Sequence, residues 1–190
     1  MSSCKAQDVI VALKLLTIGE EPWSFTRLAQ SLFISLGAAY NAVAHLRSAQ
    51  LVYERTGAAV VARRRFCDFL VHGVPVTFFP VRGGITRGIP TGAQAPVLAS
   101  VLGKAAQSND KDDPAIPIVW PSPNGKVKGE SLLPLYKTAP RAALADPKLY
   151  ELLALVDGVR VGLSREQHAC TEALYERIAG VSDMSALTSS

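Results

Sequence analysis

The 190-residue sequence has no apolar run that approaches the roughly 18 residues needed to span a bilayer. Its first residues, Met1 to Lys5, lack the apolar core and cleavage site of a signal peptide. Cysteines are scarce: Cys4, Cys67 and Cys170 are odd in number and far apart, which suits free thiols in a reducing compartment better than a disulfide framework. We therefore expect a cytoplasmic protein that does not associate with a membrane.

Residue patterns that support catalysis or metal binding are also missing. The sequence contains no G-x-S-x-G, no cysteine with a matched histidine signature and no paired carboxylate motif. Cys67 with His72, and His168 with Cys170, do not have the spacing of a structural zinc site and have no third ligand nearby in sequence. We therefore expect no enzyme activity, no catalytic residue, no metal and no cofactor.

The charge of the chain is distributed unevenly. Residues 1–89 contain ten Lys/Arg and five Asp/Glu, a net charge of +5, whereas residues 90–190 contain ten and eleven, a net charge of −1, giving +4 overall. A basic half joined to a near-neutral half is typical of a polyanion-binding domain attached to a partner-binding domain. Chance is the alternative explanation for a difference of this size. Apolar residues make up 48% of the chain, which is ample for a buried core.

Helical periodicity, N-cap residues and turn dipeptides divide the N-terminal part into short elements. Ser24 and Ser35 are predicted N-caps, Gly19 is a predicted helix end, and Thr56-Gly57 is a predicted tight turn. The predicted elements are helices over residues 7–18, 24–32 and 35–49, followed by a hairpin of strands over residues 51–53 and 58–61.

The second and third predicted helices, joined by the short turn Phe33-Ile34, have the spacing of a helix-turn-helix. Such a turn places the second of its helices across the first, so that it can enter a major groove about 12 Å wide. Ala29 is small enough for the crossing, and the apolar residues Ala39 and Leu46 lie on the inner face of the third helix. With the hairpin as a wing, this order predicts a winged helix-turn-helix.

The outer face of the third helix lacks Lys and Glu, the residues that usually cover a solvated helix. Asn41 is suited to a bidentate contact with adenine, and Tyr40 to a phosphate or a thymine methyl group. The alternative is that this face packs against the second domain or a second copy of the chain. The predicted base-contacting residues are Gly37, Ala38, Tyr40, Asn41, Ala44 and His45.

Phosphate contacts are expected from hydroxyl groups at the helix starts and from arginines around the motif. The run Arg63 to Arg65 is unfavourable at a helix N-terminus, which favours a binding role over simple solvation. The predicted phosphate-contacting residues are Ser24, Arg27, Ser35, Arg47, Arg55, Arg63, Arg64 and Arg65.

The second half of the chain reads as a mixture of short strands and helices. Gly73 is a predicted helix end, Asp146 a predicted N-cap, and Ser164 with Gln167 a predicted capping box. The predicted elements are a helix over 63–72, a strand over 74–79 with 85–89 pairing back on it, a helix over 95–102, a linker over 107–114, extended segments over 116–120 and 125–135, and helices over 146–161 and 165–178.

Two groups of charged residues in this half leave their role open. Arg82 and Arg87 lie in a glycine-rich hairpin and suit either an anionic partner or plain solvation. The charges around the joint of the last two helices favour a salt-bridge set over a dimer or partner contact. That second group is Asp157, Arg160, Arg165 and Glu166.

The stretch WSFTRLAQSLFISLGAAYNAVAHLRSAQLVYERTGAAV, residues 23–60, resembles the winged helix-turn-helix of bacterial MarR-type regulators. The shared features are the LAxxL helix, Ile-Ser before the recognition helix, and AVxxLxxAxLV leading into the wing. The sequence departs at Phe33 and Gln50, where such motifs often carry glycine. The remainder resembles bacterial winged-helix proteins regarded as transcriptional regulators, and some proteins of this plan are antitoxins that autoregulate an operon with a nucleotidyltransferase-like toxin.

These patterns together predict an α+β fold. We expect a winged helix-turn-helix domain over residues 1–73, a mixed α/β domain over 74–181 that ends in two helices, and a flexible tail over 182–190. The expected function is a transcriptional regulator, most simply a repressor that binds double-stranded DNA as a homodimer on a palindromic operator. The alternative is an antitoxin or phage-defence component that binds a cognate partner enzyme.

Overall fold

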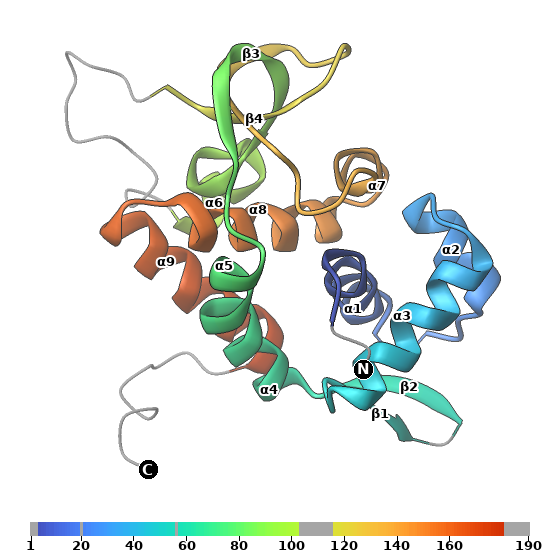
Figure 1. Cartoon of the computed structure of the whole chain (residues 1–190). Coiled ribbons are helices and arrows are strands. Elements are labelled where there is room, and N and C mark those ends of the chain that lie inside the picture. Colours follow the sequence, from blue (N-terminus) through green and yellow to red (C-terminus); the bar gives the residue numbers. More distant parts are fainter. Residues whose placement is uncertain (1–3, 20, 56, 103–115, 181–190) are drawn as a thin grey trace, which may run out of the picture. The chain divides into compact units, whose positions relative to one another are not determined.

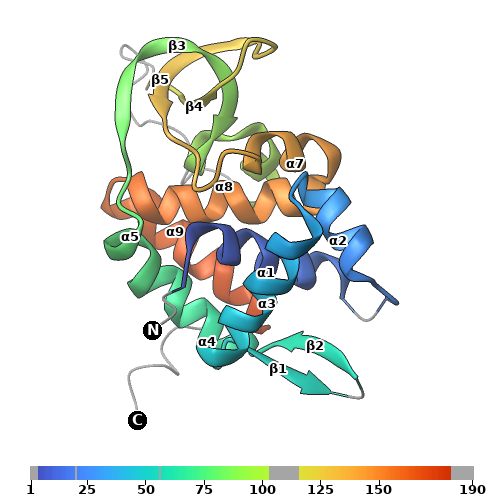
Figure 2. The ribbon, with the colours of Figure 1, turned by 45° about the vertical axis from the view of Figure 1, so that its right-hand side comes forward.

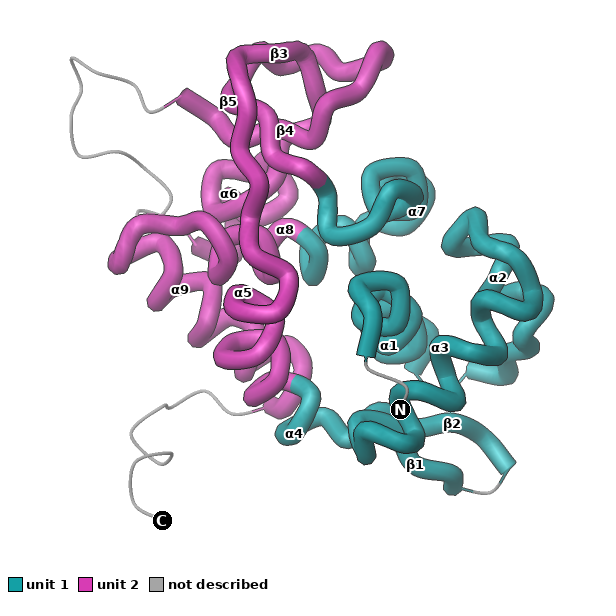
Figure 3. Tube along the Cα trace, viewed as in Figure 1, with its two compact units in different colours: residues 1–66, 134–153 teal, residues 67–133, 154–190 magenta. Residues whose placement is uncertain are grey.

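The computed structural model describes residues 4–19, 21–55, 57–102 and 116–180 (Figure 1). The expected linker over 107–114 and tail over 182–190 lie outside these ranges. Helices predominate and are accompanied by two small sheets, as expected for an α+β protein. The chain forms two compact units, residues 1–66 with 134–153 (unit 1) and residues 67–133 with 154–190 (unit 2), shown in Figure 3. Each unit consists of two separate segments of the chain, whereas the sequence analysis expected two continuous domains that meet at residue 73.

The first three helices of unit 1 are α1 (Ala6–Ile18), α2 (Phe25–Leu32) and α3 (Leu36–Ser48). The two predicted N-caps are confirmed, because Ser24 Oγ accepts from Arg27 N–H and Ser35 Oγ accepts from Ala38 N–H, each at 3.2 Å. Gly19 follows α1 with a positive φ of 66°, which only glycine adopts without strain. These capping residues explain why the helix boundaries are readable from sequence.

Two residues of unit 1 other than glycine adopt left-handed backbone. Phe33 (φ 55°) ends α2, and Gln50 (φ 57°) lies between α3 and the first strand. Both side chains are held by an arginine of the same unit. The Arg141 guanidinium lies 3.8 Å from the centroid of the Phe33 ring, and Arg65 Nη1 donates to Gln50 Oε1 at 2.8 Å. At both positions the backbone therefore has the left-handed conformation that glycine adopts readily.

The hairpin of unit 1 follows α3 and consists of β1 (Val52–Arg55) and β2 (Ala58–Val61), paired antiparallel with Val52 opposite Val61 (Figure 2). Unit 1 also contains α7 (Ala139–Ala145), which packs on α2, and the start of α8 (Pro147–Val161). The buried side chains that join its elements are Val9, Ile10, Leu13, Leu28, Leu32, Ala39, Val43, Leu46, Val52 and Val61.

The segment after the hairpin corrects one prediction. The expected helix is present as α4 (Arg63–Asp68), but it continues through a π-helical turn (Phe69–Gly73) into α5 (Val74–Thr77). The predicted helix end at Gly73 and the predicted strand over 74–79 are therefore wrong. Gly73 has a helical φ of −89° and is needed for space, since a Cβ there would lie 2.5 Å from Phe69 Cδ2.

The sheet of unit 2 joins β3 (Arg82–Thr91), β4 (Ile118–Pro121) and β5 (Val127–Leu132) into a small closed barrel. The antiparallel partners of β3 are β4 and β5, so the expected pairing of 85–89 with 74–79 is wrong. The two extended segments predicted over 116–120 and 125–135 are confirmed as β4 and β5, which pair parallel with each other. Gly88 and Gly125 allow this closure, because a Cβ on either would collide with backbone atoms.

The remaining helical segments of unit 2 are two 3-10 turns (Gly92–Gln94 and Pro96–Leu98), α6 (Ala99–Leu102), α9 (Ser164–Leu174) and a π-helical turn (Tyr175–Ala179). The predicted capping box at Ser164 is wrong. Leu163 occupies the N-cap, its N–H donates to Glu166 Oε2 at 3.3 Å, and Gln167 Nε2 instead donates to Val159 O at 2.9 Å.

Candidate nucleic-acid interface

The outer face of α3 is open to solvent at most of its predicted positions. Gly37, Tyr40, Asn41 and Ala44 are exposed, and Ala38 is half-buried. The helix contains no acidic residue, and its inner face packs against α1 and α2. Ser35 gives its side chain to the cap of this helix, so it contributes to the start of α3 as well as to the surface.

His45 differs from the other predicted residues of this face because its ring turns toward α1. Its Nδ1 lies 3.0 Å from Asp8 Oδ2, and the Asp8 carboxylate, which is buried, also accepts from Lys5 N–H at 2.8 Å. The pair fixes α3 against the first turn of α1, which makes His45 a positioning residue.

Tyr40 is half-exposed but is not a lone side chain. Its ring stacks on Phe25 with 3.8 Å between centroids, and Phe25 meets Trp23 edge to face at 5.2 Å. Two residues that the sequence analysis did not select, Trp23 and Phe25, therefore hold Tyr40 in a defined orientation at the start of α3.

Three of the predicted arginines have polar partners within unit 1. Arg27 Nη1 donates to Pro22 O at 3.5 Å, Arg47 Nη2 lies 3.3 Å from Glu54 Oε2, and Arg65 donates to the Gln50 amide. All three side chains are exposed, so each contact is weak and exchangeable. The three arginines lie in α2, in α3 and in α4 and have different partners.

Arg55 and Arg63 lie together at a different place. Side chains alternate along the hairpin, so that Tyr53 and Arg55 occupy the face opposite Glu54, the residue paired with Arg47 of α3. Arg63 follows β2 at the start of α4, and Arg64 is exposed beside it. The structure thus brings Arg55 and Arg63 to one site but separates Arg55 from the outer face of α3.

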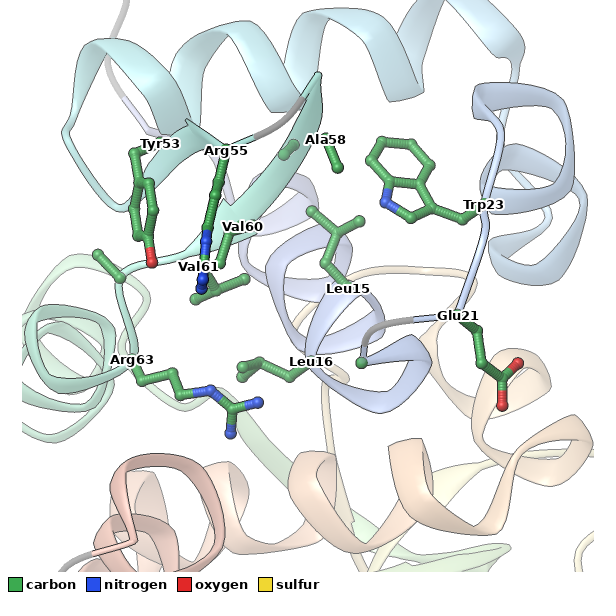
Figure 4. Close-up of a pocket in the computed structure, with 13 residues that line it drawn as sticks. Leu15, Leu16, Glu21, Trp23, Tyr53, Arg55, Ala58, Val60, Val61 and Arg63 are labelled. Carbon is green, nitrogen blue, oxygen red and sulfur yellow. The ribbon is translucent and has the colours of Figure 1, made fainter.

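That site is a pocket of about 570 Å³ within unit 1. Figure 4 shows Arg55 and Arg63 pointing into it from one side, with the Trp23 indole at the other side and Leu15 and Leu16 of α1 between them. Its remaining lining residues are Gly19, Glu21, Tyr53, Ala58, Ala59, Val60, Val61 and Ala62.

The polar residues of unit 2 form a buried network instead. Asp157 accepts from Thr91 Oγ1 at 2.8 Å, Trp120 Nε1 at 2.7 Å and Arg160 Nη1 at 2.6 Å. Burial raises the pKa of Asp157 above its ordinary value, although these three donors act against it. Arg160 Nε also donates to Phe78 O at 3.0 Å. The network joins α8 to β3, β4 and the segment after α5, and so stabilises the fold of unit 2.

The remaining charged residues near this joint do not extend the network as one set. Arg82 Nη2 donates to Val161 O at 2.7 Å and Nη1 to Glu130 at 3.1 Å, while Arg87 and Arg165 are exposed. Glu166 accepts from Leu163 N–H at the start of α9. The predicted salt bridge is therefore present between Asp157 and Arg160, while Glu166 accepts a hydrogen bond at the start of α9.

Thiol chemistry is disfavoured at two of the cysteines. Burial, with the charge of Glu166, raises the pKa of Cys170 to about 12, and burial with the charge of Asp8 raises the pKa of Cys4 to about 11. Because the thiolate is the nucleophile, these raised pKa values disfavour nucleophilic chemistry at both thiols near neutral pH. Over the described ranges there is no grouping of three or more His, Cys, Asp or Glu able to hold a metal ion.

Comparison with known proteins gave no match: no protein-family model, no characterised protein and no solved structure is significantly similar to this chain. None of the helices within residues 4–19, 21–55, 57–102 and 116–180 is both long and apolar enough to cross a membrane. Any functional assignment therefore rests on the residues and their geometry.

Proposed function

We propose that the protein is a DNA-binding transcriptional regulator in which α2, α3 and the β1–β2 hairpin act as a winged helix-turn-helix. One observation carries this proposal: α3 presents a solvent-exposed face of small and neutral polar residues that is free of acids. Such a face can approach base pairs closely without repelling the phosphates, and Asn41 has the donor and acceptor pair that adenine requires. The sequence of residues 23–60 resembles the same motif of MarR-type regulators.

The charge distribution assigns different roles to different residues. The exposed residues Gly37, Tyr40, Asn41 and Ala44 of α3 are uncharged, so they supply sequence discrimination and little of the overall affinity. Arg27 of α2 and Arg47 near the end of α3 supply phosphate contacts after exchanging their weak internal partners for the backbone of DNA. We propose that two copies bind a palindromic operator as a repressor, because a single neutral recognition helix provides little affinity. The free cysteines Cys67 and Cys170 suit a cytoplasmic site of action.

The direct test is binding to the DNA upstream of the protein's own gene, measured by fluorescence anisotropy across a salt series. We expect Asn41→Ala to weaken specific binding by about 1–3 kcal/mol while non-specific binding stays unchanged. Arg47→Gln should weaken binding to all sequences and reduce the salt slope by about one. Tyr40→Ala should lower affinity with the fold intact by circular dichroism.

The matched control is Asn124→Ala, which removes an exposed asparagine in a turn of unit 2 and should leave DNA binding unchanged. Equal affinity of wild type, Asn41→Ala and Tyr40→Ala for the operator would contradict the role proposed for α3. Light scattering of the complex measures whether two copies are bound, and one copy per operator would contradict the dimer.

A second candidate is an antitoxin or defence component whose unit 2 binds a partner enzyme. Exposed apolar side chains favour it, since Val76 and Phe79 of unit 2 are 79% and 69% exposed. Co-expression with the product of the neighbouring gene, followed by size-exclusion chromatography, tests this function. A stable complex that is lost in Phe79→Ser supports it, and separate elution of the two proteins opposes it.

A further inference from the structure

The barrel of unit 2 carries a group of exposed cations on two neighbouring strands. The register of β3 and β5, which lie side by side in Figure 2, places Arg87 directly opposite Lys128. Lys126 is two positions before Lys128, so both lysines lie on the side of the strand opposite to Val127. All three cations are exposed. Arg87, Lys126 and Lys128 are called the basic face of the barrel below.

The pairing of Arg87 with Lys128 is unfavourable for the barrel itself. Side chains directly opposite each other on antiparallel strands have Cβ atoms about 4.5–5.5 Å apart, and like charges at such positions destabilise a sheet. Within residues 4–19, 21–55, 57–102 and 116–180, no ion pair involves a residue of the basic face. The one acid of the three barrel strands, Glu130, is paired with Arg82 at 3.1 Å. No carboxylate of the described chain therefore offsets this repulsion, whereas a bound anion would.

The backbone that carries the basic face is fixed by the fold of the barrel. Ser122 N–H donates to Arg87 O at 3.2 Å, which ties the turn before Lys126 to β3. Gly125 of the same turn lies against Gly88, so closely that a Cβ on Gly125 would be 2.3 Å from Gly88 Cα. The cations therefore project from paired strands and from a turn packed on them, which keeps their attachment points at constant spacing.

The spacing of the cations fits an extended polyanion better than a single small anion. Lys126 and Lys128 are attached about 7 Å apart along the strand. Arg87 faces Lys128 from the neighbouring strand, so the three attachment points are spread over the surface. Double-stranded DNA carries one negative charge per about 1.7 Å of its axis. Lysine and arginine contacts to its phosphates add affinity and carry no sequence information.

We propose that the basic face of the barrel binds the phosphate backbone of double-stranded DNA without regard to sequence. The choice of DNA among extended polyanions rests on the function proposed above, in which unit 1 binds DNA. The basic face itself belongs to unit 2 and includes no residue of α3 or of the β1–β2 hairpin. It supplies phosphate contacts in addition to those of Arg27 and Arg47.

Fluorescence anisotropy of the full chain with a labelled duplex of scrambled sequence, measured across a salt series, tests the proposal. The double variant Arg87→Gln/Lys128→Gln should bind roughly tenfold more weakly or worse, and its salt slope should fall by about 1.8, since each phosphate contact contributes about 0.9. Lys126→Gln should lower the slope by about 0.9. The matched control is Lys137→Gln/Lys148→Gln, which removes two exposed positive charges from unit 1 and should leave affinity and slope nearly unchanged.

Reversing one charge separates DNA binding from folding. In Lys128→Glu a carboxylate faces Arg87 across the two strands, so the repulsion becomes an attraction and the thermal midpoint should stay the same or rise. Binding to the scrambled duplex should nevertheless fall further than in Lys128→Gln, because the new charge repels phosphate. Lower affinity with undiminished stability is a result that a merely structural role of Lys128 would not produce.

Three results would each overturn the proposal: no binding to the scrambled duplex at low salt, equal losses in the double variant and its control, or a double variant that loses binding to phosphatidylserine vesicles and keeps binding to DNA. Failure of the regulator function is distinguishable, because the chain would then show no preference for operator over scrambled duplex. Failure of the basic face alone would leave binding to the scrambled duplex dependent on Arg47 and independent of Arg87 and Lys128.

Discussion

Two ion pairs of unit 1 keep part of their side chains exposed, whereas one ion pair of unit 2 is almost wholly buried. In unit 1, Arg47 and Glu54 pair while 44% and 60% of their side chains stay exposed, and Lys14 and Asp146 pair while 15% and 19% stay exposed. In unit 2, Asp157 and Arg160 are only 2% and 4% exposed, and each makes additional hydrogen bonds. A charge near water can exchange partners, whereas a buried one holds its neighbours in place. The Asp157–Arg160 pair therefore stabilises unit 2, whereas the Arg82–Glu130 pair of the same unit, with side chains 43% and 32% exposed, resembles the exposed pair of unit 1.

The units also differ in how they use glycine. In the described part of the chain, the residues other than glycine with positive φ are Phe33 and Gln50, both in unit 1. In unit 2, Gly88 and Gly125 instead provide space between neighbouring backbones of the barrel. Unit 1 therefore has side chains at two of its left-handed positions. Unit 2 instead needs glycine, which has no side chain, where the backbones of its barrel lie closest together.

Among the variants that test the contrast between buried and exposed ion pairs, Asp157→Ala is expected to lose the most stability. Removal of the carboxylate leaves the Arg160 guanidinium buried without its counter-charge, so unfolding free energy should fall by about 3–5 kcal/mol. Glu130→Ala removes the partner of Arg82 from a pair with side chains 43% and 32% exposed, and should cost less than about 1 kcal/mol. Urea unfolding of the two variants measures both losses, and equal losses would show that burial does not distinguish the pairs.

A smaller effect of opposite sign is expected at Gln50. Left-handed backbone costs an L-residue about 1–2 kcal/mol, and glycine removes this strain at some entropic cost, so Gln50→Gly should stabilise the protein by about 0.5–1 kcal/mol. Gln50→Ala keeps the strain and should not stabilise it. Phe33→Gly should also fail to stabilise, because it loses the ring beneath Arg141. Thermal unfolding compares the three variants, and a lower midpoint for Gln50→Gly than for Gln50→Ala would refute this account.

The smallest effect concerns the pH dependence of unit 1. Burial acts to raise the pKa of Asp146, but hydrogen bonds from Lys14, Leu149 N–H and Thr17, together with the Lys14 charge, outweigh it and hold the pKa below its ordinary value. A carboxyl with a depressed pKa stabilises the fold above its unfolded pKa, about 3.9, and this contribution is lost as pH falls through the folded pKa. Asp146→Asn should therefore be less stable than wild type at pH 7.

Stability measured from pH 7 to pH 2 tests this prediction through the difference between wild type and Asp146→Asn. The difference should shrink as acid protonates the wild-type carboxylate. A difference that is constant over the whole range would mean that Asp146 acts as a helix cap, through its bonds to Lys148 and Leu149, and not as a charge.

Local chemistry determined how much of this structure could be predicted from sequence. Ser24, Ser35 and Asp146 cap helices through hydrogen bonds to residues two or three positions away, so each boundary follows from a short window of sequence. At Phe33 and Gln50 the sequence analysis noted only a departure from glycine, and the left-handed backbone and the arginine partners of both residues come from the structure.

Of two wrong predictions, one depends on a residue four positions away and the other on pairing between distant strands. Gly73 read as a helix end because glycine often ends helices, but here it makes room for the Phe69 ring inside a continuing helical segment. The pairing of β3 with β4 and β5 spans tens of residues, and a turn between two extended segments does not reveal that they pair parallel. The base contact predicted for His45 stays a prediction, and the sequence of α3 alone does not show that its ring meets Asp8 of α1.

The two tryptophans of the chain lie in different units. Trp23 lines the pocket of unit 1, and Trp120 is 1% exposed in unit 2, where its indole donates to Asp157. Each unit thus carries its own intrinsic fluorophore. Trp23→Phe and Trp120→Phe would leave a single emitter in one unit at a time, so that denaturation followed by fluorescence reports separately on each. Coincident curves would mean that the discontinuous units melt as one cooperative block, and separate curves would reveal an intermediate with one unit folded.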